Sequence, residues 1–511
     1  MTDWSTGYVV DLGYTFGYYT ELNPQRMRLA FLSSGLAMPE VRTACELGFG
    51  QGLSTNIHAA CSTAQWWGTD FNPAQAAFAQ ETAGSARLDT RLYDQAFEEF
   101  CTRADLPDFD YIGLHGIWSW VADANRTVLV DFLRRKLKVG GVLYISYNTM
   151  PGWAAMVPVR HLLTEHAEVM AAPGRGTVAR IDAALEFTEK LLATNPQYAR
   201  AHPQIAERIK QIKGQNRHYL AHEYFNRDWE PMPFAQMAQW LAAGKLTYAC
   251  SAHYPDHVDI VNLLPEQQAF LNDIPDAMFR ETVRDFMINQ QFRRDYWVKG
   301  ARRISVLEQS EALRKQRFLL TEDRPSVSLK VAGSLGEAAM HEAVYGPILD
   351  AVADHRCTSI GQIEDRVREK GIAFGQVVQA VMLLIGNGSL QAAQSDADIQ
   401  QAKPPAERLN AYLMDKARGT ADIPYLGSPV TGGGVQVPRI EQLFLLARSA
   451  GKTQPQDWAQ MCWQMLSAQG QRVLKDGKAL ESAADNLAEV TRLATVFAEK
   501  KLPILKALQI V

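Results

Sequence analysis

An acid followed by alternating glycines stands between the first predicted strand and the helix after it. The pattern is E-x-G-x-G-x-G, formed by Glu46, Gly48, Gly50 and Gly52. Glycine permits positive φ and lets the backbone approach a ligand closely. A dinucleotide fingerprint would need its third glycine one position later, where this chain has leucine, and an acid directly before the loop would repel a pyrophosphate. The spacing therefore predicts a site for a ligand that carries positive charge.

Two more acids follow the next two predicted strands. Asp70 closes the second strand, where a carboxylate can accept both hydroxyls of a ribose. Asp94 follows the third strand and is either an acceptor for the adenine amino group or a solvated loop acid. S-adenosylmethionine fits this set because it carries a sulfonium, an ammonium and a carboxylate on a nucleoside. The alternatives are another nucleotide-binding Rossmann-type protein or a degenerate site. The neighbours expected to line the adenine are Phe71, Asn72, Gln95 and Ala96.

A second group of residues is predicted to face the transferred group. His115, just beyond the fourth strand, is expected to contact the cofactor or the acceptor, and otherwise to be a structural histidine. Trp118 follows in the same loop and holds a cation by cation–π attraction or belongs to the core. Tyr147 ends the fifth strand, where it contacts the ligand or fixes the turn that follows. Tyr14 and Tyr18 are candidates for a lid over the cofactor, against simple packing on the edge of the sheet.

A metal site is not predicted, although two histidines lie four positions apart. His218 and His222 would share one helix face, but the order H-E-x-x-H places the acid directly after the first histidine. Here Glu223 follows the second histidine, and no third ligand is evident. His222 and Glu223 are instead expected to hydrogen-bond the helical segment to the catalytic domain.

The elements that position these residues follow from the periodicity of the chain. Strands alternate with helices up to about residue 150, which predicts an α/β fold with a parallel sheet whose ligands bind at the carboxyl ends of the strands. Residues 1–152 are therefore assigned to the first part of a cofactor-binding catalytic domain. Residues 153–230 are assigned to a helical insertion, and 231–305 to the last strands of the same sheet. Residues 306–511 form a separate, mostly helical C-terminal domain with a winged-helix-like unit.

Several segments resemble class I S-adenosylmethionine-dependent methyltransferases that carry a methyltransferase regulatory domain. The matching segments are CELGFGQG, GTDFNP, DYIGLHGIWSWV, YISYNTMPGW, HEYFN and SPVTGGGVQV. The resemblance extends over nearly the whole chain and implies a Rossmann-like, seven-stranded catalytic domain. The best-understood members of this group are bacterial protein-lysine methyltransferases that act on outer-membrane proteins. Phe49 departs from the small or polar residue often found at its position, but it leaves the glycines in place.

Composition limits the classes of function. A formal net charge of -4 argues against a nucleic-acid partner, and the six cysteines form no C-x-x-C pair. No apolar run reaches the length of about 18 residues needed to cross a membrane, and the N-terminus lacks the pattern of a signal peptide. We therefore expect a cytoplasmic protein. The resemblance implies an enzyme that methylates lysine in a bacterial protein. The alternatives are a small-molecule or surface-glycan methyltransferase and a non-catalytic cofactor-binding or scaffold protein, and a homodimer is left open.

Overall fold

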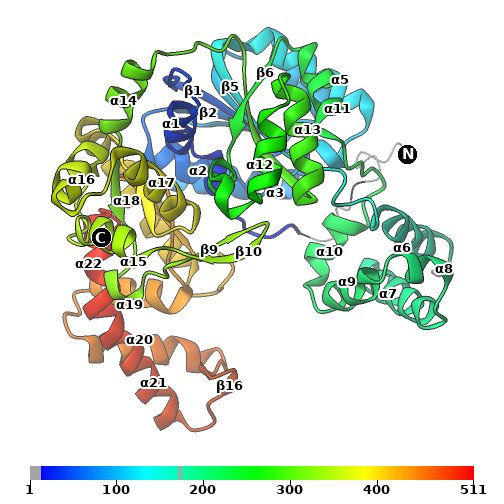
Figure 1. The fold of residues 1–511 in the computed structure, drawn as a ribbon. Coiled ribbons are helices and arrows are strands. Elements are labelled where there is room, and N and C mark those ends of the chain that lie inside the picture. Colours follow the sequence, from blue (N-terminus) through cyan, green and yellow to red (C-terminus); the bar gives the residue numbers. More distant parts are fainter. Residues whose placement is uncertain (1–7, 9–12, 171–173, 175) are drawn as a thin grey trace.

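The computed structural model describes residue 8, residues 13–170, residue 174 and residues 176–511. The beginning of the predicted first domain, residues 1–7 and 9–12, lies outside the described residues. The rest forms a seven-stranded sheet with helices on both faces, a helical unit beside it and a mostly helical C-terminal region (Figure 1). The described helices include none that is long and apolar enough to cross a membrane.

The sheet is mixed, and its strand order reverses at its centre. In spatial order the strands are β3 (Arg91–Tyr93), β2 (Gln65–Thr69), β1 (Thr43–Leu47), β4 (Phe109–Leu114), β5 (Leu137–Asn148), β7 (Phe292–Val298) and β6 (Thr247–Ser251). The first five are parallel, whereas β7 runs antiparallel to both of its neighbours. This arrangement confirms the predicted Rossmann-like, seven-stranded sheet. The carboxyl ends of β1 and β4 diverge at the reversal, where open α/β sheets bind their ligands.

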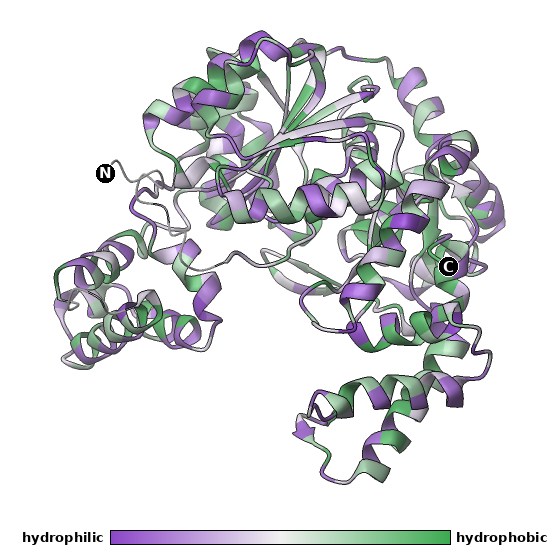
Figure 2. Ribbon diagram, turned by 180° about the vertical axis from the view of Figure 1, so that it is seen from behind, coloured by the Kyte–Doolittle hydropathy of each residue, from purple (hydrophilic) through white to green (hydrophobic). Residues whose placement is uncertain are grey.

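Helices cover both faces because successive strand residues point to opposite sides. On one face, Cys45 and Leu47 join a core that includes α4, α5 and α11, while Ala44 faces α1 on the other. The helices show alternating hydrophobic and hydrophilic stretches, as amphipathic helices do (Figure 2). The helices of this part are α1 (Pro24–Ser33), α2 (Leu53–Cys61), α3 (Pro73–Ser85), α4 (Phe97–Cys101), α5 (Asp123–Lys136), α11 (Phe234–Ala242), α12 (Pro265–Asn272) and α13 (Ala277–Ile288).

The helical unit inserted after β5 has a hydrophobic core of its own. Leu163, Leu185, Ile209 and Leu220 are all buried within it. Figure 1 shows this unit projecting from the sheet, so that its last helix, α10, lies nearest the sheet domain. Its helices are α6 (Val157–Val169), α7 (Thr177–Ala193), α8 (Gln197–Ala201), α9 (Gln204–Lys213) and α10 (Arg217–Tyr224).

The C-terminal region begins with a small sheet surrounded by helices. Strands β8 (Arg317–Leu320), β11 (Thr358–Ser359) and β12 (Leu390–Ala392) pair in the order β11-β8-β12. The helix, turn, helix and strand expected here are present, and the winged-helix assignment stays a prediction. The other elements of this part are α14 (Val306–Arg314), the hairpin β9 (Lys330–Gly333) and β10 (Gly336–Ala339), α15 (Glu342–Asp350), α16 (Ile360–Val367) and α17 (Phe374–Gly386).

The first of the remaining helices packs against the catalytic sheet domain. The long helix α18 and the strand β13 both contact α2, the helix that follows the glycine loop. Leu53 and Ile57 of α2 thereby enter the same hydrophobic cluster as Leu409 and Leu443. The elements are α18 (Asp396–Lys416), β13 (Tyr425–Ser428), β14 (Gly433–Gln436), α19 (Arg439–Ser449), α20 (Pro455–Ala468), β15 (Leu474–Lys475), β16 (Lys478–Ala479), α21 (Ala483–Val496) and α22 (Leu502–Ala507).

Candidate active site

A cavity of about 270 Å³ lies at the carboxyl ends of the central strands. The loops after β1, β2, β3 and β4 line it from the sheet domain, and α10 with the chain just after it lines it from the helical unit. Neither lysine nor arginine occurs among the described residues of its wall. Its acids are Glu46, Asp70, Glu98, Glu223 and Asp228. Such a wall attracts a cation and repels a pyrophosphate.

The glycines of the loop between β1 and α2 serve its backbone geometry. Gly48, Gly50 and Gly52 have φ values of 75°, 58° and 68°, in the left-handed region that side chains disfavour. At Gly52 an added Cβ would lie 2.5 Å from the Cβ of Ala79 on α3. Gly48 and Gly50 line the cavity, whereas Gly52 lets α2 and α3 approach each other.

Glu46 is a buried carboxylate without a basic partner among the described residues. The Thr55 hydroxyl donates a hydrogen bond of 2.5 Å to its Oε2. Burial, together with the nearby Asp70, raises the pKa of Glu46 to about 8, although the bond from Thr55 opposes this shift. A positively charged group in the cavity would stabilise the ionised form. The site therefore fits the ammonium of S-adenosylmethionine.

Asp70 follows β2 and is held by two backbone N–H groups. Gly50 donates to its Oδ2 at 2.8 Å and Asn72 to its Oδ1 at 3.0 Å. Burial raises the pKa of Asp70 to about 6 despite these two bonds. Phe71 lines the cavity beside it, whereas Asn72 does not, since its side chain accepts from Ala74 N–H at 3.0 Å and caps α3. The Asn-Pro pair thus begins the helix, as a capping residue before a first-turn proline does.

The loop after β3 is divided between the cavity and solvent. Gln95 and Ala96 line the cavity, as does Phe97 at the start of α4. Asp94 is exposed and lies outside the cavity wall. The adenine contact predicted for Asp94 therefore stays a prediction that this geometry does not favour.

His115 lies between two tyrosine rings at the end of β4. Its ring stacks on Tyr19 with a centroid separation of 3.9 Å, and its Nδ1 lies 2.8 Å from the hydroxyl of Tyr144. Burial lowers the pKa of His115 to about 4, with a smaller opposing effect from Glu21. The imidazole is therefore neutral near pH 7, and it lines the cavity where we predicted it.

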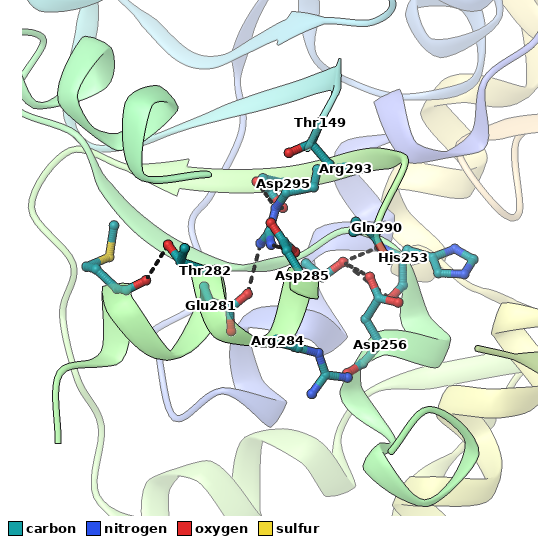
Figure 3. A network of polar contacts seen from close by, with 12 residues as sticks. Thr149, His253, Asp256, Glu281, Thr282, Arg284, Asp285, Gln290, Arg293 and Asp295 are labelled. Atoms are coloured by element: carbon teal, nitrogen blue, oxygen red, sulfur yellow. Dashed lines mark hydrogen bonds and ion pairs between the residues drawn. The ribbon is translucent and has the colours of Figure 1, made fainter. Parts of the chain in front are cut away.

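The other two predicted catalytic residues lie behind the cavity wall. Trp118 is fully buried, and its Nε1 points to the sulfur of Met232 at 3.5 Å. The hydroxyl of Tyr147 donates to Asp295 at 2.9 Å. Asp295 belongs to the polar network around Arg293 that joins β7 to α13 (Figure 3). Trp118 thus lies in the core, as its structural alternative has it. The bond of Tyr147 goes to β7, so that both roles predicted for Tyr147, ligand contact and fixing the turn, stay predictions.

The tyrosine-rich segment before α1 is split between two environments. Tyr14 lines the cavity, in the position expected of a lid residue. Tyr18 does not line it, because its hydroxyl lies 3.1 Å from Nε2 of His58 on the buried side of the segment. Tyr19, which we did not select from the sequence, lines the cavity in its place.

The helical unit contributes an acid that sequence reasoning assigned only a linking role. Tyr14 donates to Oε1 of Glu223 at 3.4 Å, and its ring lies 5.0 Å from that of His222. Tyr8 also lines the cavity, and its ring lies 5.5 Å from that of Phe71 on the side of the sheet. Burial raises the pKa of Glu223 to about 7, and the bond from Tyr14 opposes the shift. Glu223 therefore lines the cavity from α10, a position that the segment HEYFN alone does not indicate.

Comparison with known proteins agrees with this geometry. A family model described as a predicted methyltransferase regulatory domain matches residues 216–299, from α10 to β7. The uncharacterized protein sll1526 of Synechocystis sp. is 39% identical over 99% of both chains. An uncharacterized protein of Rickettsia prowazekii is 26% identical over 54% of this chain and 49% of its own. Among solved structures, PKMT2 from Rickettsia typhi in complex with AdoHcy superposes with a TM-score of 0.71 at 17% identity, covering 98% of this chain and all of the other.

The sheet, the glycine loop and the acidic cavity define a class I S-adenosylmethionine-dependent methyltransferase. The cofactor of this class is S-adenosylmethionine. Within the class, the chain belongs to the family of the Synechocystis protein and carries the methyltransferase regulatory domain.

Proposed function

We propose that this methyltransferase acts on the side-chain amine of lysine in a bacterial protein. The observation that carries the proposal is the wall of the cavity, which has acids at both ends and neither lysine nor arginine among its described residues. Glu46 and Asp70 stand at the end formed by the sheet, and Glu223 stands at the end formed by the helical unit. Two separate acidic positions suit two cations, namely the methyl donor and an ammonium acceptor.

The sheet end is assigned to the donor. S-adenosylmethionine supplies a methyl group made electrophilic by its sulfonium. Glu46 holds the ammonium of the donor and Asp70 its ribose, while Gly48 and Gly50 allow the backbone to come close. The cofactor-binding set that we propose comprises Tyr14, Glu46, Gly48, Gly50, Asp70, Phe71, Gln95, Ala96 and His115.

The helical end is assigned to the acceptor. A lysine amine must lose a proton before its nitrogen can form a bond to the methyl carbon. The bond from that carbon to the sulfonium sulfur breaks in the same step, and S-adenosylhomocysteine leaves as a neutral thioether. The aromatic rings of Tyr14 and Tyr19 exclude water from the amine and lower its pKa, while Glu223 holds it and accepts the proton. The neutral imidazole of His115 stacks on Tyr19 and thereby orients that ring beside the place where the methyl group is transferred.

The comparisons support the proposal at the level of the fold. PKMT2 denotes a protein lysine methyltransferase, and its architecture matches this chain over nearly its full length. At 17% identity the match concerns architecture. The acceptor assigned here therefore rests on Glu223 and its aromatic surroundings.

The test is transfer of a labelled methyl group to protein fractions of a bacterial lysate, with the labelled residue identified by mass spectrometry. We expect methyl-lysine in a protein band. Glu223→Gln should lower the rate by about tenfold or more, because general-base contributions are of that size or larger, while donor affinity measured by calorimetry stays unchanged.

Glu207→Gln is the matched control, since Glu207 is an exposed acid on α9 of the same helical unit. It should methylate as fast as the unmodified protein. Label found only in small molecules or glycans would refute the protein acceptor, and full activity of the Glu223 variant would refute its role.

A further inference from the structure

A second cavity, of about 220 Å³, lies between the sheet domain and the C-terminal region. It shares no lining residue with the active-site cavity. Residues from the segment before α1, from α1 and from β7 line one side. The end of α17, the following turn and β12 line the other. A ligand here would touch both parts of the molecule.

The charge of this cavity is opposite to that of the active site. Arg26 and Arg294 line it, and Glu21 is its one acid among the described residues. Burial favours the neutral form of Glu21, but the two guanidinium groups outweigh it and lower the pKa of Glu21 to about 2. His253 also lines the cavity, and burial lowers its pKa, which favours the neutral ring. Two cations therefore face one anion.

Arg26 has donors that no described residue uses. Its guanidinium stacks on the ring of Tyr254 at 4.5 Å and forms no hydrogen bond with any described residue. One terminal nitrogen of Arg294 donates a hydrogen bond of 2.5 Å to Oε1 of Glu21. The buried Nε of Arg294 has no hydrogen-bond partner among the described residues. On the opposite wall, Asn387 and Gln391 offer side-chain amides. The Nε groups of Arg26 and Arg294 thus have no acceptor among the described residues.

We propose that this cavity binds a small oxyanion, a carboxylate or a phosphate group, between Arg26 and Arg294. Guanidinium groups match the paired oxygens of both anions and form charge-assisted hydrogen bonds with them. One water molecule takes up about 30 Å³ in the liquid. The cavity therefore has room for a ligand of the size of phosphate or of a small dicarboxylate. The proposal concerns a site separate from methyl transfer and does not depend on the acceptor.

One short segment separates the two cavities. Tyr19 lines the active site, whereas Tyr18, Thr20 and Glu21 line the cavity between the domains. Tyr19 is also the residue that stacks on His115. An anion that draws Arg294 away from Glu21 therefore acts on the chain that carries this tyrosine. The site is placed to regulate the enzyme.

The experiment is calorimetric titration of the full-length protein with inorganic phosphate and, separately, with malate, at constant ionic strength and without methyl donor or acceptor. We expect saturable binding of at least one of them. The probe that binds distinguishes a phosphate site from a carboxylate site. Because neither donor nor acceptor is present, the outcome is independent of the proposed methyl transfer.

Two variants locate the site. Arg26→Gln should weaken binding by about tenfold or more, because it removes charge-assisted hydrogen bonds. Asn387→Asp should weaken it similarly, since the new carboxylate faces the cavity yet can still accept the N–H of Ser389, at 3.0 Å in the parent chain. Arg42→Gln, at a guanidinium that is 84% exposed, should bind like the parent.

Absence of saturable binding by both probes would overturn the proposal. So would binding of unchanged affinity in both Arg26→Gln and Asn387→Asp, because the anion would then lie elsewhere.

Discussion

Glu46 is the residue whose environment reveals most about the ligand. It is almost fully buried, it faces a cavity with Asp70, and its hydrogen-bond partner is a hydroxyl rather than a cation. A carboxylate in such a place is costly to ionise until a positive charge arrives. The protein thus holds a site in which ionisation of the acid and binding of a cation favour each other.

The first prediction concerns the pH dependence of donor binding. The raised pKa of Glu46, about 8, means that the ligand-free carboxyl is protonated at pH 7. A bound ammonium stabilises the carboxylate, so binding should release a proton, and the affinity should increase as pH rises toward 8. Calorimetry in buffers of different ionisation enthalpy measures the released proton directly. Proton uptake, or an affinity that decreases from pH 6 to pH 8, would contradict this role of Glu46.

The second prediction compares the contribution of Asp70 to donor binding with that of Asp94, the acid after the next strand. Asp70→Ala should weaken donor binding by about tenfold or more, because it removes charged acceptors for the ribose and leaves the N–H of Gly50 without its acceptor. Asp94→Ala is the matched control at the next strand end and should bind the donor normally, since Asp94 is exposed outside the cavity. Calorimetry decides, and equal losses in both variants would restore the adenine contact first predicted for Asp94.

The residues nearest the strand ends could be selected from the sequence, whereas those from distant segments could not. Glu46 lies near the end of one recognisable strand and Asp70 follows the next, and the carboxyl ends of parallel strands meet at one edge. Glu223 lies far along the chain from both, and nothing local to HEYFN indicates which surface its helix meets. Trp118 was left open between a cation contact and the core, because a loop position beside His115 does not reveal that the ring turns into the core.

At the scale of elements, the glycine loop positions a helix as well as a ligand. Gly52 precedes α2 and has positive φ, and Ala79 of α3 lies where its side chain would be. The loop therefore fixes how closely the two helices after β1 and β2 can approach. The sequence pattern predicted the loop, but the contact between α2 and α3 needs the tertiary structure.

The third prediction tests this contact. Gly52→Ala should lower the free energy of unfolding by about 1–3 kcal/mol, because that is the usual cost of a left-handed conformation for a residue other than glycine. The close contact between the added Cβ and Ala79 should increase this loss of stability. Gly84→Ala, within α3, is the control, because an added Cβ meets nothing within 4 Å there. That variant should be neutral or stabilised. Denaturant unfolding compares the two, and equal stabilities would show that α3 moves aside freely.

The segment before α1 shows why periodicity alone was insufficient. Tyrosine-rich sequence predicted a cover for the cofactor, and Tyr14 does line the cavity. Tyr18 was an equally good candidate by type, but it faces His58 and the C-terminal region, and Tyr19 takes its place at the cavity. From residue 13, where the continuous description begins, to Tyr19 the segment has no regular helix or strand, so no period could assign its faces.

At the scale of the whole molecule, α2 is enclosed between the sheet and the C-terminal region. All of its residues except Ala59 are buried, including polar ones such as Asn56. Its apolar residues belong to a cluster built mainly from the C-terminal helices. The alternation of strands and helices predicted the sheet, but sequence periodicity does not show which helices a second domain covers.

The fourth prediction follows from this enclosure. A chain that ends at residue 305 exposes Tyr18, Leu53 and Ile57, which pack against the C-terminal region. Each large apolar side chain contributes about 1.5–3 kcal/mol when buried, so together they approach the whole stability of a typical domain, about 5–15 kcal/mol. The shortened chain should lack a cooperative thermal transition and should not bind the donor. A transition at the temperature of the full-length protein would show that the sheet domain is independent.

The position of residues 18–21 between two cavities also has a thermodynamic consequence. Tyr19 belongs to one cavity and Glu21 to the other, so occupancy of either site acts on the same four residues. If an anion multiplies the affinity for the methyl donor by some factor, the donor must multiply the affinity for the anion equally. The supply of the donor would then set how tightly the protein holds its effector, and the signal would travel in both directions.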